Sequence, residues 1–247
     1  MVLGKLSRVL SEYNSTERTP SEIRVNSDSE IASALYWTGP SPVFLLPPRL
    51  AVMQGGHAYN VGHPFVQALS EGPVALERFY KDCVPAGLAE MYKITSRGLA
   101  GETLPPWELP WLTRTRGPPG AEGGLGLEHG VSYYGPCSPE KIELEHQRLT
   151  SLATKIRRRG YVPHKFGYIE GHFLRCGEEF RFFVRGGKHR AAVLTYLGYG
   201  SIPVRVRQSW PRVVELSREQ EWPLVASGEI DADLAVQIFV RYFRREN

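Results

Sequence analysis

The sequence has few cysteines, no long apolar run and little excess of either charge. Its three cysteines, Cys83, Cys137 and Cys176, lie far apart and form no C-x-x-C pair. This spacing argues against a disulfide framework or a zinc site and predicts a reduced, cytoplasmic protein. No apolar run approaches the roughly 20 residues of a membrane span, so no membrane partner is expected. The 30 Lys and Arg residues outnumber the 26 Asp and Glu residues only slightly, which suits phosphate ligands but is too weak a bias to predict nucleic-acid binding.

The stretch from Phe180 to Val206 has the pattern of a strand, a glycine turn, a helix and a second strand. It reads FRFFVRGGKHRAAVLTYLGYGSIPVRV. The apolar, aromatic run over 180–184 is typical of a buried strand. Helical spacing of apolar residues follows the two glycines, Gly198 is placed to end that helix, and 201–206 returns as a short strand.

The glycine turn, Gly186 and Gly187, is followed at once by the potentially cationic side chains of Lys188, His189 and Arg190. A helix N-terminus presents unpaired N–H groups and the positive end of the helix dipole. Glycines also allow a ligand to approach the main chain closely. Together these features predict an anion site, most naturally for phosphate. The alternative is a tight turn that only exposes three cations.

The segment GGKHRAAVLTYLGYGSIPVRV resembles the signature of the ParB/sulfiredoxin superfamily. In that signature a G-G-x-H-R or G-x-x-R turn opens a helix and is followed by L-G and I-P-V. The resemblance implies an α+β fold with a small mixed sheet and a nucleotide-binding turn at Gly186 to Arg190. Sulfiredoxins carry a reactive cysteine where this sequence has Lys188, so cysteine sulfinic chemistry is not expected here.

Residues 138–160 carry the start and stop signals of a long helix, from Ser-Pro-Glu to a glycine. Arg148, Ser151 and Lys155 follow each other at i, i+3 and i+7 and therefore share one face of that helix. Such a face is usually only solvated. In sulfiredoxin-like proteins, however, the corresponding helix holds ATP through a basic residue and two hydroxyls. The resemblance places the basic residue at Arg148 and the first hydroxyl at Ser151, with Lys155 in place of the second.

The glycine turn and this helix face together predict a site that surrounds a triphosphate. Arg190 and backbone amides would hold phosphates, and Lys188 or Lys155 would neutralise developing charge. A general base is also required, and His189 and Glu170 are favoured because both should lie at strand ends near the turn. The sequence leaves other bases open: Glu143, Glu145 and His146.

The superfamily contains DNA-binding partition proteins that use CTP, sulfiredoxins, and kinases that phosphorylate free serine. No basic helix-turn-helix follows the signature segment, since 213–247 is short and balanced in charge. We therefore expect a small-molecule kinase that uses ATP or ADP with Mg²⁺, and a substrate wall formed by the N-terminal region. The alternatives are a non-catalytic or CTPase-type regulatory module that binds nucleotide and DNA, and an interaction protein with a vestigial phosphate site.

The chain divides by composition into four regions. The Pro-, Gly- and Trp-rich segment 96–130 has no sustained periodicity and predicts a lid or binding loop, with Trp107 and Trp111 pinning it to the core in preference to stacking on a ligand. The predicted regions are a tail with a short helix at 1–30, a substrate or lid region at 31–130, the nucleotide-binding domain at 131–207 and a helical extension at 208–247.

Several shorter elements are also predicted. We expect strands over 131–134 and 161–169, two or three helices within 64–91, and a last helix over 232–244 with Asp231 as its cap. His57 and His63 lie in a glycine-rich stretch, but no Cys or carboxylate joins them at a familiar spacing. Ordinary loop histidines are therefore favoured over a metal site.

Overall fold

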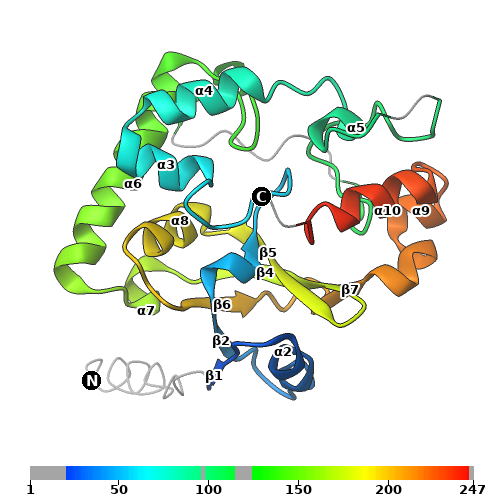
Figure 1. Cartoon of the computed structure of the whole chain (residues 1–247), viewed down its shortest axis with the longest axis horizontal. Coiled ribbons are helices and arrows are strands. Elements are labelled where there is room, and N and C mark those ends of the chain that lie inside the picture. The colour runs from blue at the N-terminus through cyan, green and yellow to red at the C-terminus, as the bar shows by residue number, and fades with distance from the viewer. Residues whose placement is uncertain (1–20, 96–97, 115–123, 245–247) are drawn as a thin grey trace, which may run out of the picture.

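The computed structural model describes residues 21–95, 98–114 and 124–244. Within these residues a mixed sheet of seven strands forms the centre of the molecule, with helices on both of its faces (Figure 1). The α+β class predicted from the sequence is confirmed. The short helix expected near the N-terminus falls in residues 1–20, outside the described part of the chain.

The strands follow the order β1-β2-β6-β4-β5-β3, and β7 pairs separately with β4. The centre of the sheet is the antiparallel β4–β5 hairpin, in which Phe173 lies opposite Phe182. Strand β6 runs parallel to the start of β4 and antiparallel to β2. The sheet thus joins strands from 22–52 to strands from the signature segment. The strands are β1 (Glu22–Arg24), β2 (Val43–Leu46), β3 (Ala51–Val52), β4 (Ile169–Cys176), β5 (Glu179–Gly186), β6 (Ile202–Val206) and β7 (Val213–Glu215).

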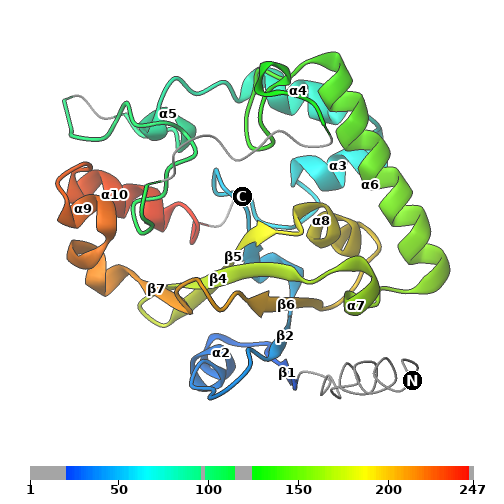
Figure 2. The ribbon, with the colours of Figure 1, turned by 180° about the vertical axis from the view of Figure 1, so that it is seen from behind.

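Helices cover the two faces of the sheet unequally. In Figures 1 and 2, α3, α4, α6 and α8 lie together on one face and α2 lies on the other, while α9 and α10 lie beside β7. The α-helices are α2 (Asp28–Ala34), α3 (Pro64–Glu71), α4 (Val74–Asp82), α5 (Leu88–Met91), α6 (Pro139–Arg159), α7 (Pro163–Phe166), α8 (Lys188–Tyr196), α9 (Pro223–Ala226) and α10 (Ala232–Val240). Short 3₁₀ turns occur at Pro48–Leu50, Leu127–His129 and Leu216–Glu221.

The ends of α6 follow from its sequence. The Ser138 hydroxyl accepts a hydrogen bond from the Lys141 backbone N–H, Pro139 occupies the first turn, and Gly160 ends the helix with φ 71°. Three arginines in the last turn place positive charge at the negative end of the helix dipole, which is stabilising. The helix bounds predicted from these signals are therefore confirmed.

Two clusters of buried apolar side chains make up the core. One lies between the sheet and α2, α3, α6 and α8, and it includes Phe44, Phe65, Phe173 and Phe182. The other joins β5 to α5 and α10 around Trp111, which is 3% exposed. Trp111 contacts Phe183, Trp222, Phe239 and Tyr242 edge-on. The expectation that Trp111 pins its loop to the core is confirmed.

Three predicted element bounds are wrong. Residues 131–134 form an irregular segment, with bends from 132 onward, instead of a strand. Within 161–169 the chain forms α7 and enters β4 only at Ile169, because Pro163 takes the first position of a helical turn that Gly167 ends. The last helix ends at Val240 instead of 244, although Asp231 caps its start as expected. The part of the chain that the structure describes contains no helix long and apolar enough to cross a membrane.

Candidate functional site

The glycine turn connects the end of β5 to the first residue of α8. Gly187 has φ 82° and ψ 24°, a left-handed conformation that favours glycine. A Cβ atom there would lie only 2.8 Å from Nε and Nη2 of Arg190. Glycine is therefore required both for the backbone and for the room that the guanidinium occupies. The first N–H groups of α8, which have no partner within the helix, open toward this turn.

Arg190 is held in place by the last residue of α7. Its Nη1 atom donates a hydrogen bond to the Phe166 carbonyl, at 2.7 Å. The opposite edge of the guanidinium, with Nε and Nη2, lies beside Gly187. One side of the guanidinium is thus fixed to the protein, and Arg190 also lines a pocket at the turn. A guanidinium edge that carries two N–H donors, such as Nε and Nη2, is able to bind a phosphate bidentately.

Lys188 is only 8% exposed, unlike the freely exposed cation that the tight-turn alternative assumes. Its Nζ atom lies 4.8 Å from the ring centroid of Tyr133 and 5.9 Å from that of Phe65. Aromatic faces attract an ammonium group at these distances. Lys188 therefore places a positive charge in the wall of the site, against the faces of two aromatic rings.

His189 is hydrogen-bonded through Nε2 to Oε2 of Glu145, a residue of α6 that is completely buried. The Ser132 hydroxyl donates to Oε1 of the same carboxylate at 3.4 Å, and the Nζ atom of Lys141 lies 3.9 Å from it. A carboxylate bound at Nε2 holds the proton of a neutral imidazole on that nitrogen. The lone pair is then on Nδ1, which is the nitrogen able to accept a proton from a ligand.

Two adjoining pockets meet at His189. One, of about 380 Å³, is lined by the glycine turn, Lys188 and Arg190. The other, of about 500 Å³, is lined by the α6 face that carries Arg148, Ser151 and Lys155. His189 and Leu152 line both pockets. The structure thus places the two predicted groups of basic residues on either side of one histidine.

The candidate bases separate clearly in the structure. Glu170 lies opposite Gly186 in the β4–β5 pairing, and its Oε2 atom would be 3.8 Å from a Cβ atom at that glycine. Glu170 therefore lies next to the turn but lines neither pocket, whereas Glu145 is hydrogen-bonded to His189. Glu143 is exposed and accepts a hydrogen bond from Gln147.

Sequence reasoning missed several residues around the site. Arg185, at the end of β5, lines the smaller pocket together with Tyr133, and burial lowers the pKa of its guanidinium. Lys141 and Glu145 were not singled out as a pair, although a signal for them exists. Both lie beside the apolar stripe of α6, where a charged side chain is costly unless it is paired.

The two histidines considered as metal ligands have other surroundings. Nδ1 of His63 accepts a hydrogen bond from the Phe65 N–H at the start of α3, and the His57 and His63 rings lie 6.4 Å apart. Within 21–95, 98–114 and 124–244, no three His, Cys, Asp or Glu side chains are arranged to hold a metal ion.

No protein-family model, curated protein or solved structure matches this chain.

Proposed function

We propose that the protein binds the polyphosphate of ATP or ADP at the glycine turn and transfers a phosphoryl group to the hydroxyl of a small molecule. The observation that carries this proposal is the position of His189. It borders both basic pockets, and its ring is held by the buried carboxylate of Glu145. A phosphate site alone has no need of a histidine oriented in this way.

The phosphates would be held from two sides. The N–H groups at the start of α8 and the free edge of Arg190 bind one phosphate, as at other helix N-termini. Arg148 and Lys155 on the α6 face bind the next, and Ser151 adds a hydroxyl donor. Lys188 and Arg185 raise the positive potential of the wall and stabilise the charge that develops on transfer.

His189 acts as the general base in this proposal. The acceptor oxygen forms a bond to the terminal phosphorus while the bond from that phosphorus to the bridging oxygen breaks, and the electron pair leaves with the nucleotide. The acceptor's proton moves to Nδ1 of His189. Glu145 then stabilises the imidazolium that forms, because its carboxylate is bound at the other ring nitrogen.

A Mg²⁺ ion in this site would be held mainly by the phosphates of the nucleotide. Mg²⁺ is usually held by substrate phosphates and only one or two carboxylates, and the one carboxylate beside Gly186, that of Glu170, lines neither pocket. When bound, Mg²⁺ offsets negative charge on the phosphates. The resemblance to the ParB/sulfiredoxin superfamily also supports nucleotide binding, and the order of strand, glycine turn, helix and strand on which it rests occurs in β5, α8 and β6.

The test is a thermal-shift panel of ATP, ADP, CTP and GTP with Mg²⁺, followed by phosphorus NMR with free serine, threonine and glycerol as acceptors. We expect an adenine nucleotide to raise the melting temperature, since a ligand that binds only the folded state stabilises it, and a phosphomonoester to form. Stabilisation without consumption, together with salt-sensitive DNA retardation, would favour the regulatory module instead. If no nucleotide stabilises the protein, the proposed site is wrong.

A further inference from the structure

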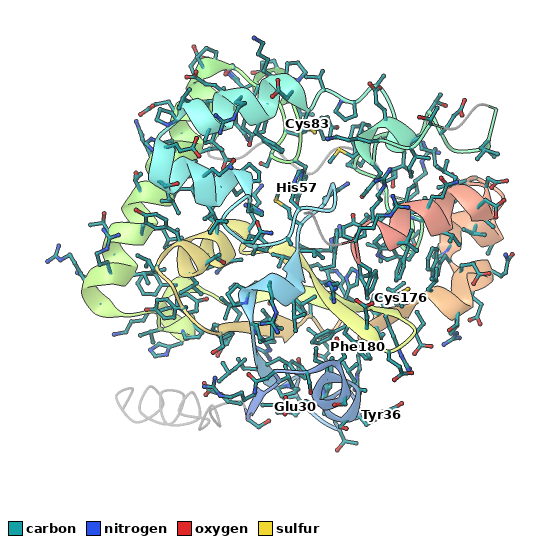
Figure 3. All side chains as sticks on the ribbon, viewed as in Figure 1. Glu30, Tyr36, His57, Cys83, Cys176 and Phe180 are labelled. Carbon is teal, nitrogen blue, oxygen red and sulfur yellow. The ribbon has the colours of Figure 1, made fainter. Side chains whose placement is uncertain are left out.

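A second cavity lies apart from the nucleotide site, on the same side of the sheet. Its volume is about 610 Å³, larger than either pocket at His189. Its walls come from the loop after β3, from α3 and α4, from α5 and the residues that follow it, and from Arg241 and Arg244 after α10. Figure 3 shows His57 on the loop after β3 and Cys83 at the end of α4, and both residues line this cavity.

The charged groups in the cavity walls are mostly cationic. Glu90, one of two carboxylates there, already accepts a hydrogen bond from the Ala86 N–H at 2.8 Å. Arg78 is paired with Glu71 outside the cavity. The lining cations are Arg78, Lys81, Lys93, Arg241 and Arg244, against Asp82 and Glu90. The balance favours an anion, and no described cluster of acids, histidines or cysteines offers a metal site instead.

Lys93 stands out among these cations. It has φ 52°, the one positive φ among the described residues other than glycine. This backbone is fixed from two sides: the Lys93 N–H donates to the Glu90 carbonyl, and Nη2 of Arg241 donates to the Lys93 carbonyl at 2.9 Å. Left-handed residues other than glycine concentrate at ligand-binding and active sites.

Lys93 lines the cavity together with His57 and Cys83. Burial and the Lys93 ammonium lower the pKa of His57 to about 4, so its ring is neutral near neutral pH and keeps an N–H donor. Burial raises the pKa of the Cys83 thiol, while Lys93 acts in the opposite direction. Phe79 and Met91 supply apolar surface to the same walls.

We infer that this cavity is a second binding site, for a small organic anion with a phosphate or carboxylate group and an apolar body. The anionic group lies at Lys93, with the His57 N–H as a further donor, and the apolar body lies against Phe79 and Met91. The volume is within the range of small-molecule sites, which combine apolar walls with a few polar anchors.

The test measures the alkylation of Cys83 by iodoacetamide in the full chain, with peptide mass spectrometry and Cys176 as the internal reference. The probes are phenyl phosphate, benzoate and the neutral benzyl alcohol. We expect either anion to slow alkylation of Cys83 several-fold and saturably, with no effect on Cys176. The anion that protects better identifies the group that the site prefers, and benzyl alcohol should not protect.

Two variants make the test specific. Lys93→Gly removes the ammonium, while glycine accepts the left-handed backbone, so the fold should hold and the protection should disappear. Because Lys93 also acts on the thiol, protection is compared as the ratio of rates with and without probe in each protein. Lys165→Gln, an exposed residue of α7, should retain it. Equal protection by benzyl alcohol, none by either anion, or full protection in Lys93→Gly would overturn the inference.

Discussion

The Nζ atom of Lys141 lies 3.9 Å from Oε1 of Glu145, one helical turn away on α6, and both side chains are only 1% exposed. Nζ has no hydrogen-bond partner in the described part of the chain. The pair stands directly behind His189, since the other carboxylate oxygen binds that ring. The proposed base is therefore oriented by a buried ion pair, in which each charge depends on the other.

Removing one member of this pair should destabilise the fold more than removing both. Glu145→Leu or Lys141→Met leaves an uncompensated buried charge, which costs about 3 kcal/mol or more. The double variant Lys141→Met/Glu145→Leu should recover most of that loss, because neither charge remains. Urea unfolding of the four proteins measures the difference. Additive effects of the two single changes would contradict the pairing.

Replacing His189 by glutamine should stop turnover without removing nucleotide binding. Loss of a positioned base costs about two to four orders of magnitude in rate. The phosphate contacts proposed for Arg190 and α8 do not involve the imidazole, so the nucleotide-induced thermal shift should persist. The matched control is His146→Gln on α6, because the His146 side chain lines neither pocket. A fully active His189→Gln protein would exclude the proposed base.

Changes at Arg190 separate charge from geometry. Arg190→Ala should abolish the thermal shift produced by nucleotide. Arg190→Lys keeps the charge but loses the two-pronged donor edge beside Gly187, so it should weaken binding by tenfold or more (about 1.4 kcal/mol). Isothermal titration with ADP and Mg²⁺ gives the affinities. If the lysine variant binds as tightly as the parent, a bidentate phosphate contact is ruled out.

Alanine at Gly187 should be more harmful than alanine at Gly160. Both glycines have positive φ, 82° and 71°, so alanine strains the backbone at each by about 1 kcal/mol. A new Cβ meets open space at Gly160 but lies 2.8 Å from the Arg190 guanidinium at Gly187. Only Gly187→Ala should also lose the nucleotide response. Thermal melts with and without ADP compare the two variants. Equal responses to ADP would show that the short distance between Gly187 and the Arg190 guanidinium does not matter for nucleotide binding.

Acid should destabilise the fold through His172. This side chain is fully buried and its Nε2 atom accepts a hydrogen bond from the Trp111 indole. Burial and the charge of Arg185 lower the pKa of His172 to about 3. The unfolded chain, with a histidine pKa near 6.5, therefore binds the proton first as the pH falls, and stability is lost below about pH 6.5.

At about pH 5 this term amounts to roughly 2 kcal/mol relative to neutral pH. His172→Gln retains an acceptor for Trp111 but does not titrate. The variant should therefore be somewhat less stable than the parent near pH 7, but it should lose about 2 kcal/mol less stability than the parent between pH 7 and pH 5. Urea unfolding of both proteins at the two pH values measures these differences. An unchanged pH dependence would show that His172 is not responsible.

The sequence predicted elements well where their signals are local. Both caps of α6, the N-cap of α10 and the turn between β5 and α8 depend on residues within one helical turn of the boundary, and these positions agree with the structure. The pairing of β2 with β6 depends on contacts between distant segments. No local pattern reports such contacts, so the contribution of 22–52 to the sheet did not follow from the sequence.

The same distinction applies to the site. Gly186, Gly187 and the basic residues after them form a contiguous motif, and the structure gathers them in one pocket. The candidate bases could not be ranked firmly from the sequence, because Glu143, Glu145 and Glu170 are equally plausible by residue type and the contact between α6 and α8 distinguishes them. Glu145 becomes distinct only through its burial and its contact with His189.

The antiparallel pairing of β2 with β6, with Phe44 opposite Val204, also constrains synthesis of the protein. A nascent chain presents β2 long before β6 has left the ribosome. Until then the edge of β2 that pairs with β6 is exposed, and an exposed apolar strand edge can pair wrongly with another chain. Translational stalling upstream of β6 should therefore yield a species that chaperones retain, whereas release after β6 permits the sheet to close.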